Sequence, residues 1–221
     1  MQEASFLDEV IHFFATADSF LWMIVAQWCA GIAIVIMKFK KYQKYQVDSA
    51  SFFDEVKKFV LNNEVRYAIQ LCSRSTSMMA RVFKPALARA NQSRQQIQDV
   101  VEAAIIESQR NVNKHLGYIG LIANFSTLFG LLGTIHGLIV SFSGLAGADP
   151  SEKARLLALG IATAMNATAV GIVSAVTLLF CHSVLSSKAH HIVSELDEYS
   201  MRLIDLIGTR KNEEYLDEEA A

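Results

Sequence analysis

Apolar residues gather in three long blocks of this chain that contain no formal charge. The blocks are residues 19–37, 115–148 and 156–187. At 1.5 Å per residue, a helix of 19 residues reaches about 28 Å, close to the roughly 30 Å hydrocarbon core of a bilayer. The second block would reach about 51 Å as a helix, so we expect it to extend beyond the bilayer. The pattern predicts an all-α, polytopic membrane protein with three transmembrane helices.

The polar segment between the first two blocks is predicted to be helical as well. Its apolar side chains first follow the 3–4 spacing of a helix with one buried face; they are Phe52, Phe53, Val56, Phe59 and Val60. A second short helix is expected over residues 63–72. Pro85 is expected at or near the start of a further helix, because proline suits the first helical turn. Since no Gly or Pro occurs from there to Leu116, we expect a long amphipathic helix that runs into the second span.

The distribution of charge predicts the orientation of the spans. Residues 1–18 carry four acidic residues and no Lys or Arg, whereas residues 38–114 carry 14 Lys and Arg residues. Basic residues beside a membrane favour the cytoplasmic side. We therefore expect residues 1–18 and a turn at 149–155 to be periplasmic. Residues 38–114 should form a cytoplasmic helical domain with long extensions of the spans, and residues 188–221 a cytoplasmic C-terminal helix with an acidic tail.

Composition supports a membrane protein and argues against several other classes. Hydrophobic residues make up 52% of the chain and charged residues 19%, against about 45–50% and 25% in soluble domains. No basic segment precedes the first block, so we expect a retained transmembrane helix, not a signal peptide. Three scattered cysteines argue against a disulfide framework. No metal-ligand spacing, nucleotide loop or catalytic set is present, so we expect no metal, no cofactor, no enzyme activity and no nucleic-acid partner. The basic segment is expected to meet membrane lipids.

Two threonines are the main candidate residues, because polar groups within a span usually face protein or water. Thr134 lies 20 residues after Lys114, and Thr168 lies 20 residues before Lys188. Both therefore lie about 30 Å from the inner boundary, on antiparallel neighbours. Either they form a polar layer, or each hydroxyl bonds a carbonyl of its own helix, as threonines in membrane helices often do.

Further polar and small residues accompany these two threonines at helical spacing. The secondary candidates for lining an ion pathway are Asn124, Thr127, His136, Ser141, Thr163 and Asn166. The residues expected to allow close helix packing are Gly130, Gly133, Gly137, Gly160 and Gly171. His136 either relays protons or acts as a neutral hydrogen-bonding residue. Neither span contains Asp, Glu, Lys or Arg, so any carboxylate on an ion pathway is expected from another chain.

Paired motifs in the two spans resemble a known family. Gly130-Leu-Leu-Gly-Thr134-Ile-His-Gly-Leu138 is followed by Gly160-Ile-Ala-Thr-Ala-Met-Asn-Ala-Thr168-Ala-Val-Gly171. Together they resemble the ExbB/TolQ/MotA proton-channel family. The three spans, the outer N-terminus and the helical domain after the first span are similar to its ExbB/TolQ branch.

The resemblance implies a stator or channel subunit of an ion-driven motor in the bacterial inner membrane. It implies a homopentamer around a dimer of a single-span, ExbD/TolR-like partner, with a partner Asp near Thr134 and Thr168. Proton flow would drive outer-membrane transport, envelope integrity or motility, through an effector of the TonB/TolA or motility kind.

Two positions depart from the family pattern and leave alternatives open. Thr163 stands where members often have Glu, and His136 stands where an aromatic residue is usual. Both bear on the ion route and on the choice between H⁺ and Na⁺, and they suggest a separate branch, such as one for gliding motility. The alternatives are a Na⁺-driven variant and a membrane scaffold whose polar stripes only pack helices. A secondary transporter is less favoured, since the chain lacks inverted repeats.

Overall fold

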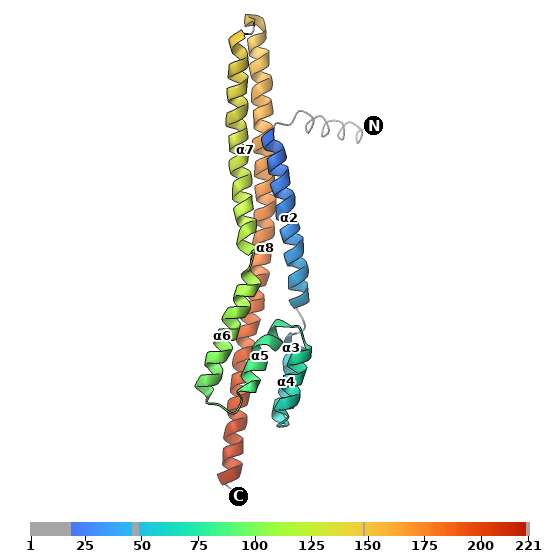
Figure 1. The fold of residues 1–221 in the computed structure, drawn as a ribbon, viewed down its shortest axis with the longest axis vertical. Coiled ribbons are helices and arrows are strands. Elements are labelled where there is room, and N and C mark those ends of the chain that lie inside the picture. The colour runs from blue at the N-terminus through green and yellow to red at the C-terminus, as the bar shows by residue number, and fades with distance from the viewer. Residues whose placement is uncertain (1–18, 46–48, 148, 220–221) are drawn as a thin grey trace, which may run out of the picture. The chain divides into compact units, whose positions relative to one another are not determined.

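The computed structural model describes residues 19–45, 49–147 and 149–219, and within these ranges the chain is helical without any β-strand. In chain order the elements are α2 (Ser19–Tyr45), α3 (Ser49–Leu61), α4 (Val65–Arg74), α5 (Met78–Ala88), α6 (Arg94–Asn113), α7 (Leu116–Gly144), the short 3₁₀ helix η1 (Leu145–Gly147) and α8 (Pro150–Glu219) (Figure 1). The segments long and apolar enough to cross a membrane are Phe20–Gln43, Arg94–Gly144 and Pro150–Arg210. The predicted all-α fold class with three candidate spans is confirmed.

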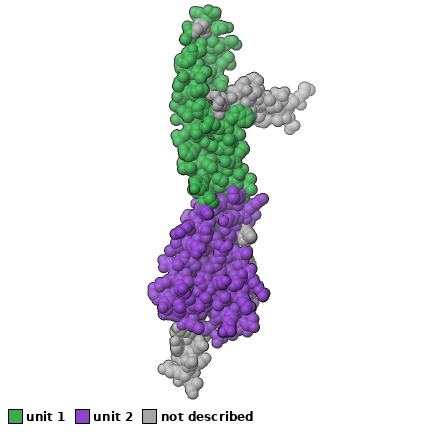
Figure 2. Space-filling view, in the orientation of Figure 1, with its two compact units in different colours: residues 1–36, 115–184 green, residues 37–114, 185–221 purple. Residues whose placement is uncertain are grey.

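The chain divides into two compact units, of which unit 1 contains residues 1–36 and 115–184 (Figure 2). In its described part, α7 packs against the N-terminal portions of α2 and α8. The buried apolar side chains there are small or branched and include Leu21, Ile24, Ile119, Ala123, Ala164, Ala167 and Leu178. Many large apolar side chains on the same helices are exposed, among them Leu128, Ile135 and Phe180. Such a surface suits lipid or protein neighbours better than water.

Unit 2 contains residues 37–114 and 185–221, and its largely aliphatic core includes a cluster of aromatic rings. The ring of Phe53 on α3 lies 5.3 Å from that of Tyr199 on α8 and 6.1 Å from that of Phe83 on α5. Phe83 is fully buried. Two serines begin the helices around this core: the Ser77 hydroxyl accepts from the Ala80 N–H, and Ser93 forms a capping box with Gln96. These caps satisfy N–H groups that have no partner within the helix.

The expectation of one long helix from Pro85 into the second span is wrong. Pro85 lies inside α5, which ends three residues later at Ala88, and α6 begins separately after Ser93. A second interruption separates α6 from α7 at Lys114 and His115. His115 has a φ of 67°, in the left-handed region that non-glycine residues rarely adopt. Neither interruption contains Gly or Pro, which is why the sequence pattern misses both.

Two side chains from α2 complete the end of α6. The Lys38 ammonium donates to the Val112 carbonyl at 2.8 Å, and the Tyr42 hydroxyl donates to the same oxygen at 3.0 Å. Val112 belongs to the last turn of α6, where carbonyls lack partners within the helix. Lys38 and Tyr42 are both buried, so this contact holds α2 against the end of α6.

The expected turn at residues 149–155 is also largely helical. Pro150 is the first residue of α8, a position where its missing N–H carries no penalty. The same helix continues without interruption to Glu219, so the third span and the expected C-terminal helix are one element.

Candidate functional site

Glycine brings the backbones of α7 and α8 together within unit 1. A Cβ placed on Gly130 would lie 3.2 Å from the Thr168 Cα, and one on Gly171 would lie 2.7 Å from the Ser126 carbonyl oxygen. Toward the other end, a Cβ on Gly137 would lie 2.6 Å from that of Ala164, and one on Gly160 would overlap Ser141. Gly133 similarly meets Ala167. Larger residues at these positions would force the two helices apart.

This close approach gives Thr168 a partner on the neighbouring helix. Its Oγ1 donates to the Gly130 carbonyl of α7 at 2.8 Å. Thr134 behaves differently, because its Oγ1 donates within α7 to the Leu131 carbonyl at 2.7 Å. Both threonines are half-buried. The two hydroxyls are thus not bonded to each other, and Gly130, one helical turn before Thr134, is the residue opposite Thr168.

The remaining polar candidates on α7 lie at different depths in the packing. Asn124 and Thr127 are exposed, and the Thr127 hydroxyl donates to the Ala123 carbonyl. Ser141 is half-buried and donates to the Gly137 carbonyl at 2.6 Å. These bonds to the residue's own helix satisfy the hydroxyl without a ligand.

A groove between α7 and α8 collects three of the candidates. His136 and Ser141 line it from α7, and Thr163 lines it from α8. The small residues Gly137 and Gly160 leave room for it. Thr163 is exposed and donates to the Leu159 carbonyl at 2.9 Å.

The structure also places the candidate residues His136 and Asn166. The ring of His136 lies 5.2 Å from that of Phe20 on α2. Asn166, on α8, is half-buried.

Three polar residues of these spans that lie outside the candidate set have structural positions of note. Ser126 is fully buried against α8 and donates to the Ile122 carbonyl. Its spacing of four residues before Gly130 continues the small-residue stripe and could have identified it. Ser174 is also buried. On α2, the Gln27 side-chain oxygen is buried without a hydrogen-bond partner among the described residues; as a lone amide within an apolar span, it offered a signal.

The described part of the chain also bears on the expectations for metal ligands and cysteines. No group of three His, Cys, Asp or Glu side chains there could hold a metal ion. Cys29, Cys72 and Cys181 are free thiols, of which only Cys72 is fully buried. Burial raises the pKa of the Cys72 thiol to about 11. The polar side chains at the α7–α8 contact include hydroxyls and two imidazoles, His136 in the groove and His182, whose Nε2 lies 4.0 Å from a Cβ placed on Gly120.

Comparison with known proteins finds relatives of one kind. Residues 74–198 match the MotA/TolQ/ExbB proton channel family. A biopolymer transport protein ExbB homologue of Methanothermobacter thermautotrophicus is 22% identical over 201 residues, which are 87% of this chain and 71% of that protein. The Tol-Pal system protein TolQ of Haemophilus influenzae is 30% identical over 99 residues, which are 43% of this chain and 42% of that protein.

A solved structure shares the fold over most of the chain. The structure of C. jejuni MotAB matches with a TM-score of 0.65 at 18% identity, covering 88% of this chain and 79% of that one. For a biopolymer transport protein of Vibrio cholerae serotype O1, 35% identical over 100 residues, the match spans 43% of its length. This chain thus spans less than half the length of two of these relatives.

Proposed function

The chain belongs to the MotA/TolQ/ExbB proton channel family, and we propose that it is the stator subunit of a motor driven by ion flow across the bacterial inner membrane. Five copies surround a dimer of a single-span partner of the ExbD/TolR kind. The N-terminus is periplasmic, and residues 38–114 and the C-terminal segment are cytoplasmic. Proton flow through the assembly performs mechanical work on an effector of the TonB/TolA or motility kind.

One observation carries this proposal: the α7–α8 contact holds polar groups without any acid to match them. No Asp or Glu occurs in residues 116–147 or 156–187. The Thr168 hydroxyl reaches the Gly130 carbonyl of α7, one turn before Thr134, within the paired motifs. Proton carriers within membranes usually use an ionisable group. The partner therefore supplies a carboxylate, and Thr134 and Thr168 face it.

The hydrogen bonds of the two threonines define what they offer to that carboxylate. Each hydroxyl has one proton, and both protons are directed at carbonyls, of Gly130 and Leu131. Each oxygen keeps lone pairs that accept hydrogen bonds. In this arrangement the hydroxyls accept from a protonated carboxylic acid and do not donate to an ionised one. The contact thus favours the protonated, neutral form of the partner's carboxylic acid. In this form the carboxyl group passes the apolar part of the ion pathway.

Proton uptake by proteoliposomes that contain the chain and its single-span partner tests this function. We expect Thr134→Ala and Thr168→Ala to leave assembly intact and to abolish proton uptake. Thr177→Ala is the matched control, because this half-buried threonine of α8 donates to its own helix at Val173. Normal uptake in both Thr134→Ala and Thr168→Ala would exclude the proposed site.

A change in the partner separates the motor from a membrane scaffold. Substitution of the partner's membrane Asp by Asn should stop uptake in the motor and leave a scaffold's function unaltered. Uptake that follows a Na⁺ gradient in the absence of a pH gradient would identify the Na⁺-driven variant.

A further inference from the structure

A histidine of α8 lies against α7 near the end of the spans that Lys114 and Lys188 mark, which the proposed function places on the cytoplasmic side. The Nε2 of His182 would lie 4.0 Å from a Cβ placed on Gly120, so the glycine leaves space beside the ring. The His182 side chain is half-buried, and its imidazole forms no hydrogen bond or ion pair with the described residues. Neither ring nitrogen is therefore committed to a partner within the described chain.

Charged side chains lie beyond the part of the spans that contains His182. The first ones toward the inner end are Lys38 on α2 and Lys188 on α8, and Lys114 precedes α7. Toward the other end of α8 the nearest is Arg155, 27 residues or about 40 Å away. Between these limits the other titratable side chains are Cys29, Tyr118, His136 and Cys181, with His115 at the start of α7. Tyrosine and cysteine ordinarily ionise above pH 8, so the imidazoles are the groups that take up protons near neutral pH.

The other two imidazoles in the described part of unit 1 lie elsewhere. His136 is 16 residues farther along α7 than Gly120, about 24 Å along the helix. His115 is exposed, and its ring stacks on that of Tyr118, which lies about 160° around α7 from Gly120. His182 is thus the imidazole that lies between the two helices at their inner end.

The threonine contact creates a need for such a proton acceptor. Thr134 and Thr168 direct their hydroxyl protons at carbonyls, so they accept from a protonated carboxylic acid and keep it neutral. Thr127 is arranged in the same way, with its proton on the Ala123 carbonyl. Hydroxyls do not take up protons near neutral pH. The partner's acid must therefore give its proton to a group farther along the path.

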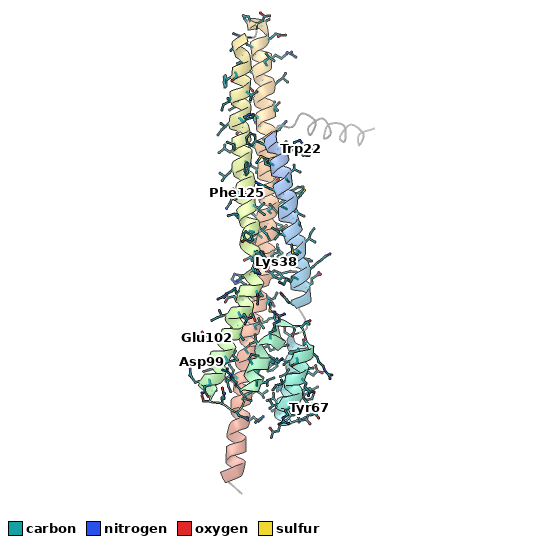
Figure 3. All side chains as sticks on the ribbon, in the orientation of Figure 1. Trp22, Lys38, Tyr67, Asp99, Glu102 and Phe125 are labelled. Carbon is teal, nitrogen blue, oxygen red and sulfur yellow. The ribbon has the colours of Figure 1, made fainter. Side chains whose placement is uncertain are left out.

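A line of polar positions leads from the threonines to His182. Thr134, Thr127 and Gly120 are seven residues apart, so they follow one edge of α7 at intervals of about 10.5 Å. The imidazole of His182 meets this edge at Gly120. Phe125, labelled in Figure 3, is 44% exposed and lies about 160° around α7 from Thr127, so the opposite side of α7 is apolar there.

We propose that His182 accepts the proton that the partner's acid releases toward the cytoplasm. The carboxylic acid loses a proton and becomes a carboxylate, and water carries this proton to the imidazole, which becomes an imidazolium. Water must connect them, because Thr168 and His182 are 14 residues apart, about 21 Å along α8. The imidazolium then gives one proton to cytoplasmic water and returns to the imidazole, so each cycle moves one proton. This inference rests on the proposed function and names the group that releases its protons.

Proton uptake by proteoliposomes that contain the chain and its single-span partner tests this role, with a potassium diffusion potential as the driving force. His182→Gln keeps a polar side chain that cannot carry a proton, and we expect its uptake to fall roughly 100-fold. His190→Gln is the matched control, because His190 is an exposed histidine of the same helix, and its uptake should be normal. Native mass spectrometry shows whether both variants assemble with the partner.

Chemical rescue separates proton transfer from packing. His182→Ala leaves space beside Gly120, and imidazole at equal concentration on both sides of the membrane should restore uptake several-fold. Pyrazole, a ring of the same size that is far less basic, should not restore it. Wild-type proteoliposomes with the same imidazole correct for its buffering.

The other outcomes separate this role from the proposed function. Normal uptake by His182→Gln, while Thr168→Ala is inactive, overturns the inference and leaves the motor intact. Rescue of His182→Ala by both rings or by neither also overturns it, because the side chain then acts through packing. A wild-type assembly that takes up no protons contradicts the proposed function itself.

Discussion

Replacing Gly171 by alanine tests how closely α7 and α8 approach. A Cβ at this position would lie 2.7 Å from the Ser126 carbonyl oxygen and 3.1 Å from the Gly130 Cα. Cβ atoms in proteins essentially never come within 3.0 Å of a heavy atom of a residue that is not a chain neighbour. Both neighbours are backbone atoms, so no side-chain rotation relieves the overlap. The helices must therefore separate by several tenths of an ångström, and the hydrogen bond from Thr168 to Gly130 lengthens with them.

The expected loss of stability follows from two opposing effects. Overpacking of this kind typically costs about 1–3 kcal/mol. Alanine is in turn the better helix former, by about 1 kcal/mol. Gly117→Ala is the matched control, because a Cβ there would meet nothing within 4 Å, and it carries the helix-propensity gain alone. The difference in free energy of unfolding between the two variants should therefore be about 1–3 kcal/mol, with Gly171→Ala the less stable.

Unfolding of the purified protein, followed by circular dichroism against the mole fraction of sodium dodecyl sulfate, measures that difference. Proton uptake of the same two variants shows whether the helix separation reaches Thr168, and we expect Gly171→Ala to be impaired and Gly117→Ala to be normal. Equal stability of the two variants would refute the close α7–α8 contact on which the arrangement of the site depends.

Two further predictions concern unit 2. Ser93→Ala removes the hydroxyl of the capping box of α6 and should lower the free energy of unfolding by about 1 kcal/mol. Ser73→Ala is the control, because it loses only an exposed hydrogen bond to the Ile69 carbonyl and should be near neutral. Equal losses of stability in denaturant unfolding would argue against the cap. Burial raises the Cys72 pKa from 9.0 to about 11, so the folded state disfavours the thiolate. The contribution of this thiol to the stability of the folded state is therefore complete below pH 9 and declines as the pH rises toward 11. In a chain with Cys29→Ala and Cys181→Ala, alkylation at pH 8 should be slow until the protein is unfolded, and rapid labelling of the folded protein would contradict this burial.

The helical class follows from patterns that are local in sequence. Charge-free blocks longer than a bilayer and the 3–4 spacing around Phe53 are enough to predict helices over the spans and over α3. The points where these helices end, in contrast, do not follow from the local sequence. At Lys114 and His115 the helix ends without Gly or Pro, and Lys38 and Tyr42 stabilise that end from 70 or more residues away. A contact of such separation leaves no periodic signal, so a continuous helix is the natural expectation from sequence alone.

The register between α7 and α8 shows the corresponding limit for the site. Counting from Lys114 and Lys188 places Thr134 opposite Thr168, because it uses the boundary charges as fixed depth markers. Long basic side chains extend along the helix to reach the membrane surface, so their Cα positions locate that surface only to within about a turn. The small residues set the actual register, since they bring the two backbones into contact where Gly130 meets Thr168 and where Gly171 meets Ser126. The threonines and the glycines are all visible in the sequence, yet only packing decides that the Thr168 hydroxyl bonds a backbone carbonyl of α7 and leaves Thr134 one turn further along.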